Sequence, residues 1–161
     1  ININDIDRKA FYKNVAYVMQ NDYIYDNTIK HNIELYKEYE EEKIKDAVQN
    51  AELLQTIEKL DNKYETLIGE NGIKLSGGQK QRLVLSRNLV TNPNILIIDN
   101  GFTGLDLETR KKVVENLSNK NKKTTLIIIS SMIEDIKNAD KIYVLENKKL
   151  KEVKQQEVCN A

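Results

Sequence analysis

Short apolar runs and longer segments with helical spacing alternate along the chain. Apolar runs of strand length occur at residues 15–19, 95–98 and 124–129. Strands that are apolar at nearly every position are typical of parallel sheets buried on both faces. Residues 142–145 and 149–153 have the pattern of an antiparallel pair around Asn147. The sequence therefore predicts an α/β fold with a mainly parallel sheet and a closing hairpin.

Predicted helices occupy most of the remaining chain. Apolar spacing and capping residues place them at residues 7–14, 28–33, 40–49, 51–60, 76–90 and 106–117. Between residues 21 and 75 no strand-like run interrupts the helical segments. We therefore expect one structural unit over residues 1–161, in which a helical subdomain at 21–75 precedes a sheet-forming remainder at 76–161.

Composition narrows the classes of partner. Apolar residues make up 40% of the 161 residues, and 25 basic and 25 acidic side chains cancel to zero net charge. This balance argues against nucleic-acid binding and gives no attraction to a charged membrane surface. The apolar runs are shorter than the about 20 residues of a membrane helix, and residues 1–15 lack a signal-peptide core. The lone Cys159 excludes a disulfide framework and favours a reducing compartment.

The clearest candidate for chemistry is Leu75-Ser76-Gly77-Gly78-Gln79, at the predicted start of a helix. Backbone N–H groups at a helix start bind anions, helped by the positive end of the helix dipole, and Ser76 adds a hydroxyl donor. Gly77 and Gly78 are expected to let a phosphate approach the backbone closely. The alternative interpretation is an ordinary serine N-cap beside a loop.

Polar residues also follow two of the predicted strands. Asp99 comes directly after the run 95–98, Gly104-Leu105-Asp106 forms a turn before the next helix, and Ser130-Ser131 follows the run 124–129. Nucleotide enzymes place a Mg²⁺ ligand at the carboxyl end of a buried parallel strand, which is where Asp99 stands. Taken alone, such an aspartate is more often a turn residue that ends its strand.

Together these stretches resemble the ATP-binding-cassette (ABC) transporter family over almost the whole chain. The similar stretches are residues 75–79 (the signature motif, without a mismatch), 95–99 (the Walker B strand), 104–106 (the D-loop), Gln20 (the Q-loop), 64–72 (the stretch before the signature in exporter-type members), and 138–142 with 144–147 (the C-terminal end). The resemblance implies a partial P-loop NTPase fold. In that fold the helical subdomain lies between the Q-loop and the signature.

The resemblance also implies a mechanism shared between two domains. In this family two nucleotide-binding domains, identical or different, pair head to tail and sandwich ATP with Mg²⁺. Closure of the sandwich drives the transmembrane domains from the cytoplasmic face of the cell membrane. By this resemblance, Ser76, Gly77, Gly78 and Gln79 would contact the γ-phosphate of ATP that the partner domain holds. Gln20 and Asp99 would bind the Mg²⁺ and the water of this chain's own site. Asp106 would contact the partner domain.

Three features depart from the family pattern. The phosphate loop G-x-x-x-x-G-K-[ST] is absent because no glycine precedes a lysine, and the aromatic residue that stacks on adenine is missing. We therefore expect an N-terminally truncated domain without tight ATP binding. Asn100 stands at the position of the catalytic glutamate, and loss of a general base typically costs about 10²–10⁴-fold in rate. Ser131 stands at the position of the switch histidine, and the only histidine, His31, is interpreted as a solvated surface residue.

These departures leave three functions open. The first is the energy-coupling ATP-binding subunit of a membrane exporter. Its own ATP site would be degenerate and inactive alone, but its signature motif would complete a competent ATP site on the partner domain. The second is a non-catalytic remnant or regulatory ABC-type module, in which Asn100 and Ser131 reflect sequence drift. The third, a soluble DNA-maintenance ATPase, is disfavoured because no long heptad run precedes the signature. Tyr17, Tyr23, Tyr25 and Tyr36 are accordingly interpreted as packing residues rather than base-stacking ones.

Overall fold

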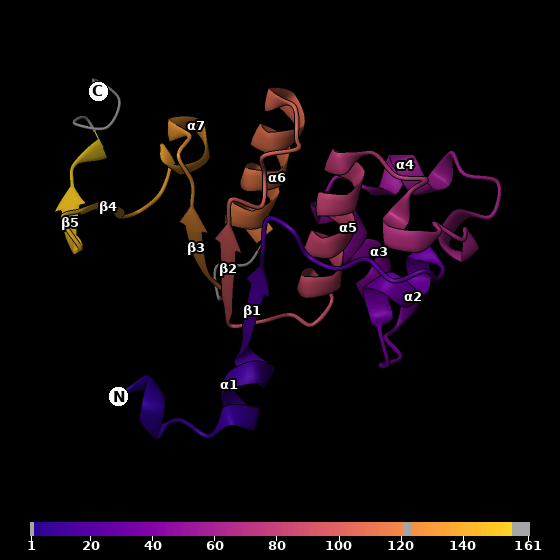
Figure 1. The fold of residues 1–161 in the computed structure, drawn as a ribbon, viewed down its shortest axis with the longest axis horizontal. Coiled ribbons are helices and arrows are strands. Elements are labelled where there is room, and N and C mark those ends of the chain that lie inside the picture. The colour runs from indigo at the N-terminus through magenta and orange to yellow at the C-terminus, as the bar shows by residue number, and fades with distance from the viewer. Residues whose placement is uncertain (1, 121–123, 156–161) are drawn as a thin grey trace.

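A computed structural model describes residues 2–120 and 124–155 of the chain. Its centre is a three-stranded sheet in the order β1-β2-β3, with β1 at Val15–Val18, β2 at Ile95–Asp99 and β3 at Thr125–Ile129. Neighbouring strands run parallel (Figure 1), and Ile98 pairs with Val18 on one side and Ile128 on the other. The predicted α/β fold with a parallel sheet is therefore confirmed.

The predicted closing hairpin is also present. β4 (Ile142–Glu146) and β5 (Lys149–Val153) pair antiparallel and form a separate two-stranded sheet. Between them Asn147 and Lys148 adopt positive φ values of 49° and 64°. Two successive left-handed residues are what a tight two-residue hairpin turn requires, and asparagine tolerates that conformation better than most residues.

The helices follow the prediction closely, with two differences. They are α1 (Arg8–Asn14), α2 (Ile29–Glu34), α3 (Glu41–Asn50), α4 (Leu54–Glu58), α5 (Gly77–Leu89), α6 (Leu107–Lys120) and α7 (Ile133–Ile136), with short 3₁₀ turns at Ile3–Asp5, Lys63–Glu65 and Glu70–Gly72. The helix expected at 51–60 is shorter, because Glu52 takes a positive φ of 57° directly after α3. The single turn α7 had no counterpart in the prediction.

Residues 21–75 contribute α2, α3 and α4, which gather on one side of α5 (Figure 1). Ile33, Val48 and Ile57 from these helices are fully buried and belong to the same apolar core as Leu83 of α5. A polar connection reinforces this packing, since Arg87 of α5 donates to the Asn32 carbonyl at 2.7 Å. The helical group therefore packs directly on the helix that begins at the signature motif.

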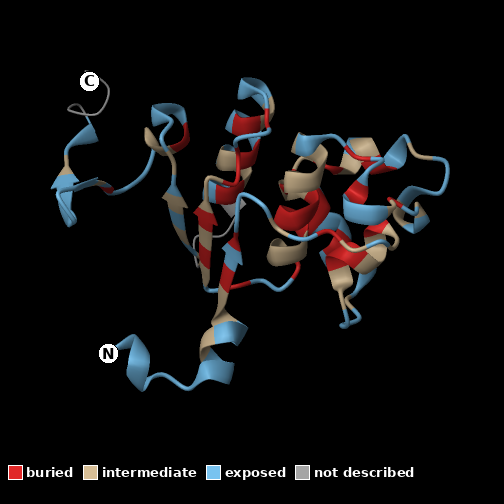
Figure 2. Ribbon diagram, in the orientation of Figure 1, coloured by how far each residue is buried: buried red, intermediate tan, exposed pale blue. Residues whose placement is uncertain are grey.

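The expectation that the strands are buried on both faces was wrong. Ala16, Val18, Leu96 and Ile98 point into the core shared with α5 and α6, and each is at most 9% exposed. On the opposite face Tyr17, Ile127 and Ile129 are 43%, 43% and 48% exposed (Figure 2). The physical reason is that, within the described residues, α5 and α6 cover the first face and no helix packs on the second.

Two expectations from the sequence concern membrane-spanning helices and the single cysteine. In residues 2–120 and 124–155 no helix is both long and apolar enough to cross a membrane. Cys159, which the sequence analysis used to exclude a disulfide framework, lies outside the described residues.

Candidate functional site

The candidate residues gather at the carboxyl edge of the parallel sheet. Asp99 ends β2 and pairs with Ile129, the last residue of β3. Gln20 follows β1, and Ser130 and Ser131 follow β3. Because parallel strands end at the same edge, these polar residues share one side of the sheet, where ligands of open α/β sheets bind. The helix α5 runs back toward the start of β2, so its N-terminus also lies on this side (Figure 1).

Ser76 begins α5 with a capping box. The Ser76 Oγ accepts a hydrogen bond from the Gln79 N–H at 3.3 Å, and the Gln79 Oε1 accepts one from the Ser76 N–H at 2.8 Å. The interpretation of Ser76 as an N-cap is thus correct, and it does not exclude an anion site. A hydroxyl that accepts one hydrogen bond can still donate its own proton, and the first N–H groups of the helix have no acceptor within the helix.

The two glycines of the motif have different surroundings. Apart from its chain neighbours and the backbone of its own helix, a Cβ placed on Gly77 would meet no heavy atom of the described residues within 4 Å, so this backbone is open to an approaching ligand. A Cβ on Gly78 would lie 2.6 Å from the carbonyl oxygen of Gly104, far inside contact distance. The approach of a phosphate to both glycines stays a prediction, and the open Cβ position is found at Gly77 and not at Gly78. Gly78 is required because the turn at Gly104 packs against it.

Asp106 stands exposed at the end of that turn and caps α6. Its Oδ1 accepts from the Thr109 N–H at 3.0 Å, and its Oδ2 accepts from the Thr109 hydroxyl at 2.7 Å. These hydrogen bonds from the backbone and side chain of Thr109 lower the pKa of the Asp106 carboxyl below its ordinary value of 3.8. Asp106 is therefore a carboxylate at neutral pH, on the same side of the molecule as Ser76.

Asp99 has a partner that the sequence analysis missed. The Tyr17 hydroxyl donates to Asp99 Oδ2 at 2.9 Å, and this hydrogen bond raises the pKa of the Tyr17 phenol above 10.0. Tyr17 had been interpreted as a packing residue. The signal that could have found the contact is the parallel register, because Tyr17 pairs with Ile97, and side chains two residues apart along a strand share a face.

Asn100 follows Asp99 in a left-handed conformation with φ of 49°. Its N–H donates to the Ile129 carbonyl at 2.9 Å, which joins the ends of β2 and β3. Its side-chain amide donates to Asp99 Oδ1 at 3.4 Å. Asparagine tolerates this backbone conformation, and its neutral amide stabilises the neighbouring carboxylate. At this position an amide cannot accept a proton at neutral pH.

Ser130 and Ser131 have opposite environments. The Ser130 hydroxyl donates to Asp135 Oδ2 at 2.5 Å, and the Met132 N–H donates to the Ser130 oxygen at 3.0 Å. Asp135 in turn forms a buried ion pair with Arg110 at 3.5 Å. Ser131 is exposed beside this network. Ser131 is thus exposed, whereas Ser130 holds the loop, and the role of Ser131 at a nucleotide stays a prediction.

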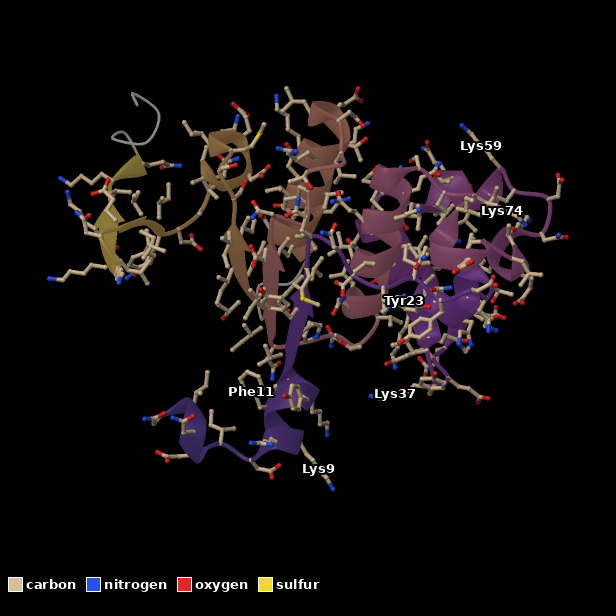
Figure 3. All side chains as sticks on the ribbon, in the orientation of Figure 1. Lys9, Phe11, Tyr23, Lys37, Lys59 and Lys74 are labelled. Atoms are coloured by element: carbon tan, nitrogen blue, oxygen red, sulfur yellow. The ribbon has the colours of Figure 1, made fainter. Side chains whose placement is uncertain are left out.

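Gln20 lies at this edge without a hydrogen bond to Asp99 among the described residues, and His31 lies away from it. Gln20 is exposed, and among the described residues the hydrogen bonds of the Asp99 side chain go to Tyr17 and Asn100 rather than to Gln20. His31 lies on α2, edge-on to the rings of Tyr25 and Tyr36. Figure 3 shows Tyr23, whose ring contacts Tyr25, among the side chains of the helical group.

Mg²⁺ bound with a nucleotide requires little from the protein. In the described residues no three histidine, cysteine, aspartate or glutamate side chains cluster as a metal site would. Mg²⁺ is usually held by one or two carboxylates together with phosphate oxygens and water. Asp99, an oxygen donor at the strand end, fits that requirement, and the amide oxygen of exposed Gln20 is a second oxygen on the same edge.

Comparison with known proteins adds independent information. The sequence profile of a family described as ABC transporter matches residues 1–103. An ATP-dependent lipid A-core flippase of Pasteurella multocida is 38% identical over 154 residues, which are 94% of this chain and 26% of the flippase. An uncharacterized ABC transporter ATP-binding protein of Bacillus subtilis is 38% identical over 149 residues, covering 92% of this chain and 26% of that protein. The chain thus spans about a quarter of the length of these relatives.

A solved structure matches the fold as well as the sequence. It is that of a bacterial Atm1-family ABC exporter with ATP bound, and it superposes with a TM-score of 0.90 at 28% identity. The match covers 98% of this chain and 28% of the exporter chain. The arrangement of the parallel sheet, the helical group and the terminal hairpin is therefore one that an exporter also has.

Proposed function

Because this chain belongs to the ABC transporter family, we propose that it is an ATP-binding, energy-coupling part of an ABC exporter. In this role its signature motif contacts the ATP that is bound by a second nucleotide-binding domain. The observation that carries the proposal is the open start of α5, where a Cβ on Gly77 would meet no described residue beyond its chain neighbours and its own helix within 4 Å. The relatives named as a flippase and an ATP-binding protein, and the exporter of known structure, support the same role.

The donors at this helix start suit the terminal phosphate of a nucleotide. Ser76 offers its hydroxyl proton, and the N–H groups of Gly77 and Gly78 lie at the positive end of the helix dipole. Hydrogen bonds to an anion are about twice as strong as those between neutral groups. Gln79 holds the Ser76 backbone through the capping box and so fixes these donors before a ligand arrives.

The chain's own nucleotide site is proposed to be degenerate. ATP supplies the phosphoryl group, and its Mg²⁺ would be held by Asp99 and Gln20. Asn100 keeps the Asp99 carboxylate in place through its amide but offers no base to the attacking water. Ser131 is a neutral hydroxyl at the position of the switch histidine. In this proposal the chain's useful chemistry lies in the site that it completes on its partner.

The helical group is proposed to dock the transport domains at the cytoplasmic face of the membrane. Tyr23 and Tyr36, which lie before and after α2 in the sequence, are 60% and 84% exposed. Tyrosine is enriched at protein interfaces because it combines an apolar ring with a polar hydroxyl. These two side chains therefore support a protein partner on this face, where the sequence analysis interpreted them as packing residues.

ATP turnover by the full chain and its partner domain tests the proposal. The full chain alone is expected to turn over ATP slowly, and addition of a partner with an intact phosphate loop should raise the rate. Ser76→Ala should remove most of that rise. The matched control is Ser118→Ala on the exposed face of α6, whose hydroxyl donates only to the Val114 carbonyl at 2.8 Å.

Two outcomes would overturn the proposal. Rapid turnover by the full chain alone would show that its own site is competent. Partner turnover that Ser76→Ala and Ser118→Ala leave equally unchanged would show that the signature does not act in trans, and would favour the regulatory or remnant module.

A further inference from the structure

One side chain, Gln81, uses both ends of its amide to hold the turn before Asp106. Its Nε2 donates to the Thr103 hydroxyl at 3.0 Å, and its Oε1 accepts from the Gly104 N–H at 2.8 Å. Gln81 lies in the second turn of α5, behind the signature motif. Gln81 is not one of the residues proposed to contact the partner's ATP, because its side-chain amide is already hydrogen-bonded to Thr103 and Gly104.

The same two segments also touch through their backbones. A Cβ on Gly78 would lie 2.6 Å from the Gly104 carbonyl oxygen, and a Cβ on Gly104 would lie 3.3 Å from the Gly77 carbonyl carbon. Such contacts leave no room for the two turns to slide past each other. The hydrogen bonds of Gln81 therefore connect two segments, the start of α5 and the turn at Gly104, that already pack closely against each other.

The far side of the turn is held by α6. The Arg110 Nη2 donates to the Phe102 carbonyl at 2.7 Å, and the Leu105 N–H donates to the same oxygen at 3.0 Å. Arg110 is 6% exposed and paired with Asp135. The turn at Thr103–Gly104 is thus fixed by a buried arginine on one side and by Gln81 on the other.

We propose that Gln81 is a positioning residue that couples the signature turn to the turn carrying Asp106, so that both meet the partner domain as one rigid unit. The proposal rests on the function proposed above. Of the two supports of the turn, Arg110 belongs to α6, whereas Gln81 belongs to the signature helix α5 and connects that helix to the turn. Loss of the Gln81 amide would leave Ser76 and Asp106 in place separately but would loosen their relative position.

Substitutions at both ends of the contact test the coupling. In Gln81→Met the side chain keeps its length and loses both hydrogen bonds, whereas the carboxylate of Gln81→Glu can accept from the Gly104 N–H and from the Thr103 hydroxyl. Thr103→Val removes the other partner of the amide. The same chemical change at exposed Gln55 of α4, Gln55→Met, serves as the control.

Two measurements on the full chain are needed. Amide hydrogen exchange should show the Gly104 N–H exchanging about tenfold faster in Gln81→Met, since a lost hydrogen bond of about 1.4 kcal/mol corresponds to that factor. Gln81→Glu and Gln55→Met should exchange as the unaltered chain does. ATP turnover with the partner domain should fall about five- to tenfold in kcat for Gln81→Met, with KM for ATP unchanged, and Gln81→Glu should restore it.

These measurements separate the two proposals. If Ser76→Ala abolishes partner turnover but Gln81→Met leaves kcat unchanged, the positioning role is refuted while the proposed function stands. If Gly104 exchange accelerates as expected but neither Ser76→Ala nor Gln81→Met affects turnover, the proposed function fails. A fall in thermal stability of Gln81→Met that Gln81→Glu does not reverse would assign the residue to folding alone and would also refute the positioning role.

Discussion

The contrast between Gly77 and Gly78 allows the signature motif to be tested with two single methyl groups. Alanine at 77 would place its Cβ in open space, whereas alanine at 78 would place it 2.6 Å from the Gly104 carbonyl oxygen. Neither glycine has a positive φ, so alanine carries no backbone strain at either position. The two substitutions are therefore chemically identical and differ only in what the methyl group meets.

The expected effects on stability have opposite signs. Gly77→Ala should stabilise the full chain by about 0.4–1 kcal/mol, because alanine restricts the unfolded chain and fits the first turn of a helix. Gly78→Ala should destabilise it by about 1–3 kcal/mol, the usual cost of overpacking, because the obstacle is a backbone atom that cannot rotate away. Urea denaturation of both variants, compared with the unaltered chain at the same protein concentration, measures the two shifts.

The expected effects on turnover distinguish a phosphate site from a packing site. Gly77→Ala should abolish most of the ATP turnover of the partner domain while the chain remains fully folded, because the methyl group occupies the approach to the helix N-terminus. Gly78→Ala should lower turnover together with stability. Equal destabilisation by both variants would refute the assignment of the two glycines. Normal turnover in Gly77→Ala would refute the phosphate approach at this residue.

Three other predictions concern the sheet edge and its supports. Asn100→Glu places a carboxylate base at the strand end, on a left-handed backbone that asparagine tolerates better than glutamate. At ATP concentrations high enough to offset the missing phosphate loop, turnover at this chain's own site should rise by up to about 10²-fold; no rise would show that a missing base is not what limits that site. Arg110→Met should destabilise the chain by about 3–5 kcal/mol because it leaves Asp135 buried without its ion pair, whereas the double variant Arg110→Met/Asp135→Leu should lose much less, as thermal melting can show. Folding lowers the pKa of the Asp106 carboxyl below 3.8, so its contribution to stability is present above pH 3.8 and is lost as the pH falls through the folded pKa. The acid unfolding of Asp106→Asn should therefore depend less steeply on pH than that of the unaltered chain.

The sequence was sufficient for the fold class and most of the elements, and it predicted candidate residues that the structure places at the carboxyl edge of the sheet. Strand runs, the N-cap at Ser76 and the hairpin at Asn147 are local signals, and all three are present in the structure. The burial of β3 could not be inferred in this way. An apolar strand looks the same in sequence whether one or two of its faces are covered, and Ile127 is exposed because the helices of the described residues lie on one face.

Contacts between distant segments were the other limit of the prediction. The Tyr17–Asp99 hydrogen bond joins residues 82 positions apart and depends on the register of two parallel strands. The difference between Gly77 and Gly78 depends on where the turn at Gly104 packs. Composition and motif spacing contain neither piece of information, since both follow from how the segments are arranged in space.

The backbone after β2 bears on the proposal that a degenerate nucleotide site coexists with an intact signature. Position 100 is held by backbone groups: the Asn100 N–H donates to the Ile129 carbonyl at 2.9 Å, and the Thr103 N–H donates to the Asn100 carbonyl at 3.4 Å. The turn at Thr103–Gly104 is held in addition by the side chains of Gln81 and Arg110. None of these hydrogen bonds uses the side chain at position 100, but its φ of 49° favours residues that tolerate a left-handed backbone, as asparagine does. The exposed Ser131 side chain likewise lies apart from the hydrogen bonds that hold its loop, which are made by Ser130. Asn100 and Ser131 therefore fit this backbone without displacing the turn that supports the signature, so the proposed degenerate site is compatible with the presentation of Ser76 and Gly77 to a partner.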